Sequence, residues 1–203
     1  IVEGGIYIWY NNDWLLVERE DPFFFDYNDQ NVKRYYEYEN GAWVLADPKV
    51  RITDAIETRE FFFLPEAITV ASGKKNATIT ILKDISGINS RMTYSASNTT
   101  CTLDLNGHTV RGAVPFTDDN NRGLLKINAS GTTFTITDNS ANKDGRLENI
   151  CEQNKVTYAV HLMAGTLNVE HGTIHAENPA QYASKVSADL GVSAVLTGCG
   201  ARG

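Results

Sequence analysis

The chain has 203 residues, of which 42% are hydrophobic and 21% are charged, and its formal net charge is −7. These values are typical of a globular protein that buries an ordinary core. No apolar run approaches the roughly 20 residues of a membrane-spanning helix, so no membrane span is predicted. Acidic residues outnumber basic ones and Lys and Arg do not cluster, so nucleic acid is not an expected partner.

The first 60 residues contain a degenerate repeat. Residues 7–16 and residues 35–45 each consist of an aromatic strand, a turn that contains Asn, and a second strand with a Trp near its start. Asn40-Gly41 favours the positive φ angles of a type I′ turn, and Asn11-Asn12-Asp13 supplies a similar turn. We predict two similar β-hairpins that share one small, aromatic-rich sheet in a domain of residues 1–60.

Aromatic side chains on these hairpins are candidate ligand contacts, because exposed rings stack on sugars. The same side chains would supply the bulk of the core of so small a sheet, and we favour this second interpretation for each of them. The candidates are Trp9, Tyr10, Trp14, Tyr38 and Trp43, with Tyr36 beside them.

A short helix is predicted to begin near residue 64. Pro65 suits a first helical turn, and Gly73 suits the position where such a helix ends. Residues 77–82 then alternate apolar and polar side chains as a strand does. An amphipathic helix at this place would cap the open end of a stack of strands.

From residue 77 onward, short alternating strands are separated by Asn, Asp and Gly turns, and they repeat as triplets. Residues 102–107, 133–138 and 166–171 align as the middle strand, and residues 108–111, 145–148 and 172–175 align as the next one. Residues 79–82, 124–127 and 159–162 align as the preceding strand, and residues 194–197 would begin a further repeat. A β-sandwich also has many short strands, but it gives no reason for this repeated order. We therefore predict stacked parallel strands in a domain of residues 61–203 that continues or docks beyond residue 203.

Three segments resemble a known family. Residues 101–110, CTLDLNGHTV, resemble a recurrent coil of secreted pectate-lyase-like β-helix proteins of gut bacteria, and residues 77–85 resemble the strand that opens such domains. Residues 165–174, GTLNVEHGTI, are similar to their recurrent GTLTINGGTI coil. The resemblance implies an all-β right-handed parallel β-helix in a secreted or cell-surface protein. It implies no particular activity, because this superfamily holds lyases, hydrolases, adhesins and phage spikes.

Alternation assigns the side chains that would face solvent on each strand. The predicted outward rows are Lys126, His161 and Val195; Asp104, Thr135 and Asn168; and Arg111, Glu148 and His175, the last flanked by Thr109, Arg146 and Thr173. The row of Arg111, Glu148 and His175 is the best candidate for a polar ligand site. A ladder of surface ion pairs, worth roughly 0–1 kcal/mol each, is the simpler interpretation, and nothing in the row requires a perturbed pKa.

No catalytic residue, metal site or cofactor is predicted. The resemblance implies clustered acidic calcium ligands in lyases and paired carboxylates in hydrolases, but Asp104 and Glu170 would lie about 10 Å apart and are offset along their strands. His171 and His175 lack a placed third zinc ligand. The three cysteines form no Cys-x-x-Cys pair and are expected to be small buried residues.

These features predict a non-catalytic module for adhesion, carbohydrate binding or structural assembly, with a carbohydrate or a surface protein as its partner. An open C-terminal coil would also allow self-association, because it leaves strand edges uncovered. The alternative is a polysaccharide lyase or glycoside hydrolase whose site is incomplete in this chain.

Overall fold

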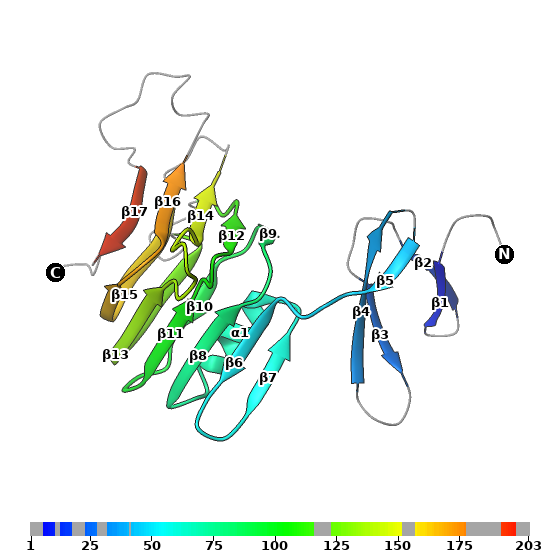
Figure 1. Ribbon diagram of the computed structural model, residues 1–203, viewed down its shortest axis with the longest axis horizontal. Helices are drawn as coiled ribbons and strands as arrows, with labels where there is room; N and C mark the ends of the chain where they lie inside the picture. The colour runs from blue at the N-terminus through cyan, green and yellow to red at the C-terminus, as the bar shows by residue number, and fades with distance from the viewer. Residues whose placement is uncertain are drawn as a thin grey trace, which may run out of the picture. The chain divides into compact units, whose positions relative to one another are not determined.

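The computed structural model describes residues 6–10, 13–17, 23–27, 32–40, 42–115, 123–151, 157–177 and 192–197, with side chains for residues 40, 46–115, 123–151 and 157–177. The described chain is mostly β, with parallel sheets and one short helix (Figure 1). It divides into two compact units, residues 1–47 and residues 48–203.

The first unit contains both predicted hairpins. Strands β1 (Ile6–Tyr10) and β2 (Asp13–Val17) pair antiparallel, as do β4 (Val32–Glu39) and β5 (Ala42–Leu45). Asn40, in the second turn, has a φ of 50°, the conformation for which Asn is favoured. The prediction that the hairpins share one sheet is wrong. Strand β3 (Phe23–Tyr27) pairs with β4 instead and completes a three-stranded sheet, so β1 and β2 form a separate pair.

The second unit begins with β6 (Val50–Thr53) and β7 (Thr58–Phe61), which the sequence pattern groups with the hairpins. Strand β6 pairs antiparallel with both β7 and the first parallel strand, β8 (Asn76–Ile81). Val50 and Ile52 are buried in the same core as the later strands, because alternate positions of β6 face that core. Residues 48–60 are therefore structurally part of the second unit.

The remaining strands of the second unit stack in parallel. They are β9 (Ile85–Ile88), β10 (Met92–Tyr94), β11 (Thr100–Asp104), β12 (Thr109–Gly112), β13 (Leu125–Thr137), β14 (Arg146–Ile150), β15 (Thr157–Val169), β16 (Thr173–Glu177) and β17 (Val192–Thr197). One sheet has the order β17-β15-β13-β11-β8-β6-β7, with β10 also on β13, and a four-stranded sheet has the order β16-β14-β12-β9.

Strands β13 and β15 are long, and their first and second parts pair with different strands. The first part of β13 pairs with β10 and the second part with β11, while β17 pairs with the first part of β15. Gly165 lies at the bend of β15 with a φ of +99°, and a Cβ atom there would be 2.5 Å from the Ala129 carbonyl oxygen. Only glycine fits this close approach of two neighbouring strands.

The registers confirm part of the predicted alignment and correct the rest. Thr109, Arg146 and Thr173 lie side by side as predicted. In the middle row, however, Thr133 pairs with Thr100 instead of Thr102. Strand β8 pairs with β11, so it does not belong to the preceding row, whose first member is β10. A shift of two residues keeps every side chain on the same face, so alternation alone does not detect it.

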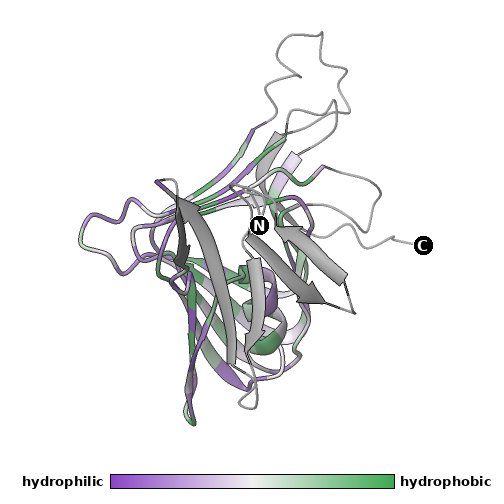
Figure 2. Ribbon diagram, turned by 90° about the vertical axis from the view of Figure 1, so that its right-hand side faces the viewer, coloured by the Kyte–Doolittle hydropathy of each residue, from purple (hydrophilic) through white to green (hydrophobic). Residues whose placement is uncertain are grey.

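The core of the second unit consists of inward side chains from successive strands, and the alternation of hydrophobic and polar residues along them is visible in Figure 2. The predicted helix is confirmed as α1 (Leu64–Ala71), with Pro65 in its first turn. Its buried face joins this core through Leu64, Ala67, Ile68 and Ala71. The helix ends where the Gly73 amide donates to the Val70 carbonyl oxygen at 3.0 Å.

Candidate functional site on the four-stranded sheet

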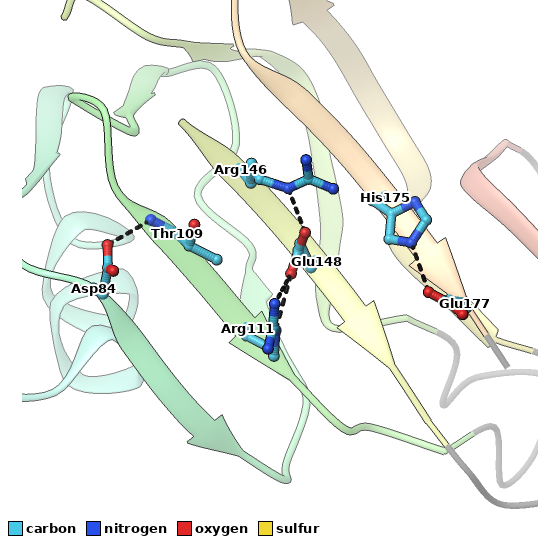
Figure 3. Close-up of polar contacts among 7 residues, drawn as sticks. All are labelled: Asp84, Thr109, Arg111, Arg146, Glu148, His175 and Glu177. Atoms are coloured by element: carbon cyan, nitrogen blue, oxygen red, sulfur yellow. Dashed lines mark hydrogen bonds and ion pairs between the residues drawn. The ribbon is translucent and has the colours of Figure 1, made fainter. Parts of the chain in front are cut away.

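Outward side chains of β12, β14 and β16 form two rows across the four-stranded sheet (Figure 3). One row contains Arg111, Glu148 and His175, which the register places side by side as the sequence predicts. The other contains Thr109, Arg146 and Thr173. Parallel strands lie about 4.8 Å apart, so each row brings its three side chains within reach of one another.

Glu148 is the centre of this arrangement, and it is buried. Its side chain is only 3% exposed, whereas the Arg111 and Arg146 side chains are 55% and 43% exposed. Arg111 donates to Glu148 Oε2 through Nε at 2.9 Å, its Nη2 lies 2.8 Å from the same oxygen as an ion pair, and Arg146 donates to Oε1 through Nε. The two guanidinium groups thus cover one carboxylate and occupy both of its oxygens.

These contacts set the charge state of Glu148. Burial by itself raises the pKa of the carboxyl group, but the hydrogen bonds and charges of Arg111 and Arg146 outweigh it, and the pKa lies below its ordinary value. The predicted ion pair between neighbouring strands is confirmed for Arg111 and Glu148, but the expectation of an exposed group with an unperturbed pKa is wrong for Glu148. Alternation gives the outward direction of Glu148 correctly, but it does not show that two long neighbours cover the carboxylate.

His175 makes a separate pair in the same row. Its Nε2 lies 3.2 Å from Glu177 Oε2, two residues further along β16 (Figure 3). At the opposite side of the face, Asp84 Oδ1 accepts the Thr109 amide at 2.9 Å and lies 3.3 Å from His108 Nδ1. Arg111 itself lies opposite a bulge of β9, where Ser86 and Gly87 together face this one residue.

A second group of carboxylates lies in the turns that precede β12 and β14. Asp138 is fully buried and accepts the amides of Gly107 at 2.9 Å, Ser140 at 2.9 Å and Gly145 at 2.6 Å. Burial raises the pKa of Asp138, but the bonds from Ser140, Gly145 and Gly107 outweigh it and lower the pKa overall. This carboxylate connects two successive turns, mainly through backbone donors.

Asp104 was an outward candidate in the sequence, and the structure buries it. Its Oδ1 accepts the amides of Asn106 and Asn139, and its Oδ2 accepts the Asn139 side-chain amide at 3.0 Å. Its register partner is Thr137, and Thr135 pairs with Thr102 instead. Asp104 therefore holds its own turn in place through the Asn106 amide and connects it to the next turn through Asn139.

The predicted outward row of Lys126, His161 and Val195 is also corrected. Lys126 and His161 do pair side by side, but they are only 8% and 0% exposed. Val195 pairs with Val160, one position away. Both faces of this part of β13 are buried, since Leu125 and Ile127 are buried too, so alternation does not distinguish an outer face here.

The aromatic candidates lie on the hairpins. Trp9 pairs with Trp14, Tyr10 with Asp13 and Tyr38 with Trp43 in the backbone register. Their side chains lie outside the described residues, so their role in ligand binding stays a prediction. The sequence analysis placed Arg146 only in the flanking row, whereas the structure makes it a direct partner of Glu148. Its spacing of two residues from Glu148 could have indicated this, because it puts both side chains on one face of β14.

Cys101 and Cys151 are buried free thiols, as expected for small core residues, while Cys199 lies outside the described residues. Burial raises the pKa of Cys101 to about 12. Across the described ranges, no three His, Cys, Asp or Glu side chains gather as metal ligands would. No helix in the same ranges is long and apolar enough to cross a membrane. Comparisons with protein families, curated proteins and solved structures gave no match.

Proposed function

We propose that this chain is a non-catalytic module of a secreted or cell-surface protein, built on a right-handed parallel β-helix, which binds carbohydrate. The binding surface in this proposal is the outer face of β12, β14 and β16, here called the arginine face: Thr109, Arg111, Arg146, Glu148, Thr173 and His175. The resemblance of residues 77–85, 101–110 and 165–174 to secreted β-helix proteins supports the extracellular assignment.

The parallel rows of strands support the β-helix. Three successive stretches of strand recur in the same order, and each pairs with its counterpart in the next repeat. Connections between parallel strands of one sheet are right-handed in about 98% of cases, which favours that hand for this stack.

The observation that carries the binding proposal is the fixed geometry of the arginine face. Glu148 holds two half-exposed guanidinium groups in defined positions on neighbouring strands. When the polar groups of a surface are already ordered, the entropic cost of binding a ligand there is smaller. Guanidinium, imidazole and hydroxyl groups together suit a ligand that has many hydroxyl and ring oxygens.

The same geometry favours binding over hydrolysis. A glycosidase needs one carboxyl group that carries a proton at working pH, and the pKa of such a group is raised. The pKa of Glu148 is lowered, and both its oxygens accept bonds from arginine. Asp104 and Asp138 are likewise occupied by amides of their own turn and of the neighbouring repeat.

A polysaccharide screen followed by calorimetry tests the proposal on the whole chain. We expect Arg111→Ala and His175→Ala to weaken binding of the selected glycan by about tenfold each, because each removes donors that face the ligand. Arg51→Ala is the matched control, since Arg51 forms an exposed pair with Glu60 on β6 and β7.

Three other outcomes would contradict the proposal. Equal losses in Arg111→Ala and Arg51→Ala would show that charge alone attracts the glycan. Loss of binding in Trp9→Ala or Trp43→Ala, with the arginine variants unchanged, would place the ligand on the hairpins. Release of oligosaccharides by the wild-type chain would show an enzyme.

A further inference from the structure

The arginine face has hydrogen-bond donors left over and few acceptors. Arg111 uses Nε and Nη2 on Glu148, and Arg146 uses Nε. The Nη1 group of Arg111 and both Nη groups of Arg146 donate to no other described residue, and both side chains are about half exposed. A guanidinium group has no acceptor atom, so these groups only donate.

The acceptor that lies between the two arginines is occupied. Both oxygens of Glu148 accept from arginine, while Asp84, at the β9 side of the face, accepts the Thr109 amide through Oδ1 and has an exposed side chain. Glu177 pairs with His175 and lies two residues further along β16. It is therefore four residues, or about 13 Å, along the strands from the row that contains Arg146. At that distance its charge is largely screened at physiological ionic strength. A ligand of this face is therefore recognised by the oxygens that it offers as acceptors.

We propose that the arginine face binds a tetrahedral oxyanion, carried as a sulfate or phosphate ester on the glycan. This inference rests on the proposed carbohydrate-binding function and names its ligand class. The free donors come from two strands and two rows, so they can reach more than two oxygens of one anion, and a sulfate or phosphate ester has three free oxygens where a carboxylate has two. The hydroxyl of Thr109, beside Arg146 in register, is a further donor at the same place.

Open space adjoins Arg111 on the side away from Glu148. Gly87, in the β9 bulge, has a φ of +76°, and a Cβ atom there would meet nothing within 4 Å. Ser86 and Gly87 are both exposed. The bulge thus leaves room for an ester group beside the guanidinium group, where a regular strand would place a side chain.

The test compares three polymers with one backbone: dextran, carboxymethyl-dextran and dextran sulfate of equal length. We expect the whole chain to bind dextran sulfate at least about tenfold more tightly than carboxymethyl-dextran, and Arg146→Gln to remove most of that difference. Arg51→Gln changes the net charge by the same amount at an exposed pair on β6, and it should change the affinity less than about twofold.

Thr109→Val is a second variant that should not disturb folding, because the bonds of both arginines to Glu148 remain. It should weaken dextran sulfate binding while the melting temperature stays within about 2 °C. Calorimetry with sodium sulfate and sodium phosphate then distinguishes the two esters. Tighter binding of either ion to the wild-type chain than to Arg146→Gln supports the oxyanion site.

The outcomes separate this inference from the proposed function. Equal affinity for all three dextrans, lost in Arg111→Ala, would overturn the oxyanion and leave carbohydrate binding intact. A preference for carboxymethyl-dextran would overturn the tetrahedral geometry. Binding of the free ions but of no polymer would support the oxyanion site and refute carbohydrate binding. Equal losses in Arg146→Gln and Arg51→Gln would overturn the site altogether.

Discussion

Two buried carboxylates in the second unit are held in different ways. Asp138 accepts three backbone N–H groups of its own and the preceding turn, and a bond from the Ser140 side chain. Glu148 accepts N–H groups of two arginine side chains that are half exposed. Both have a lowered pKa, yet the first arrangement has no groups left for a ligand and the second has several. Electrostatic perturbation alone therefore does not distinguish an architectural carboxylate from one that belongs to a binding surface.

The largest effect is expected from Asp138→Ala. The substitution leaves the buried amide of Gly145 and the partly buried amides of Gly107 and Ser140 without their acceptor, at about 1–3 kcal/mol each. We expect the free energy of unfolding to fall by about 3–5 kcal/mol in urea denaturation. Asp144→Ala, an exposed change in the same turn, is the control. A loss below about 1 kcal/mol would show that water replaces the carboxylate.

Gly145→Ala tests the same turn by changing a residue whose backbone amide bonds to Asp138. A Cβ atom at this position would be 2.7 Å from both Asp138 Oδ2 and Leu105 Cβ. We expect the free energy of unfolding to fall by about 2 kcal/mol, because both contacts are too short and the surrounding atoms must move. Gly73→Ala, where the nearest atom would be 3.4 Å away, should change it little. Equal stability of the two variants would contradict this.

Glu148→Gln should cost less than the loss of Asp138, about 1–2 kcal/mol, because the arginines that it releases reach water. Thermal unfolding measures the change. Glu60→Gln is the exposed control, and it should cost at most about 0.5 kcal/mol. If Glu148→Gln lowers the free energy of unfolding no more than Glu60→Gln does, Glu148 contributes only as an exposed ion pair would.

The smallest effect is expected in the pH dependence of stability. A carboxyl group with a lowered pKa in the folded state contributes stability that is fully present above its unfolded-state pKa, about 4, and that is lost as the pH falls through the folded value. The wild-type chain should therefore lose stability below about pH 4. Asp138→Asn and Glu148→Gln should each make that loss less steep in urea titrations. Unchanged slopes in both variants would mean that other groups dominate.

The sequence predicts the fold well where local rules decide. Pro65 and Gly73 delimit α1, Asn40 lies in a two-residue turn, and the row of Thr109, Arg146 and Thr173 is in register. It fails where two arrangements satisfy the same pattern. Pairing Thr133 with Thr100 or with Thr102 gives the same inner and outer faces, and only three-dimensional packing selects one.

The site is predictable as a row but not as a chemical environment. Alternation brings Arg111 and Glu148 together, whereas the burial of Glu148 depends on how two long side chains fold over it. The short strand β10 escaped prediction because its three residues, Met92–Tyr94, are too few to show a period. Lys126 and His161 are polar residues in a segment that is buried on both faces, which contradicts the assumption behind the pattern.

The side chain of Asn149 forms hydrogen bonds with the main chain as a backbone peptide group of a neighbouring strand would. Its Oδ1 accepts the Val114 amide at 2.8 Å, and its Nδ2 donates to the carbonyl oxygens of Val114 at 2.9 Å and Tyr158 at 2.8 Å. Val114 and Tyr158 are thereby anchored to a strand, independently of the length of chain that follows or precedes them. Evolution or protein design can therefore lengthen, shorten or exchange the connection after Val114 or the one before Tyr158, because Asn149 fixes one end of each.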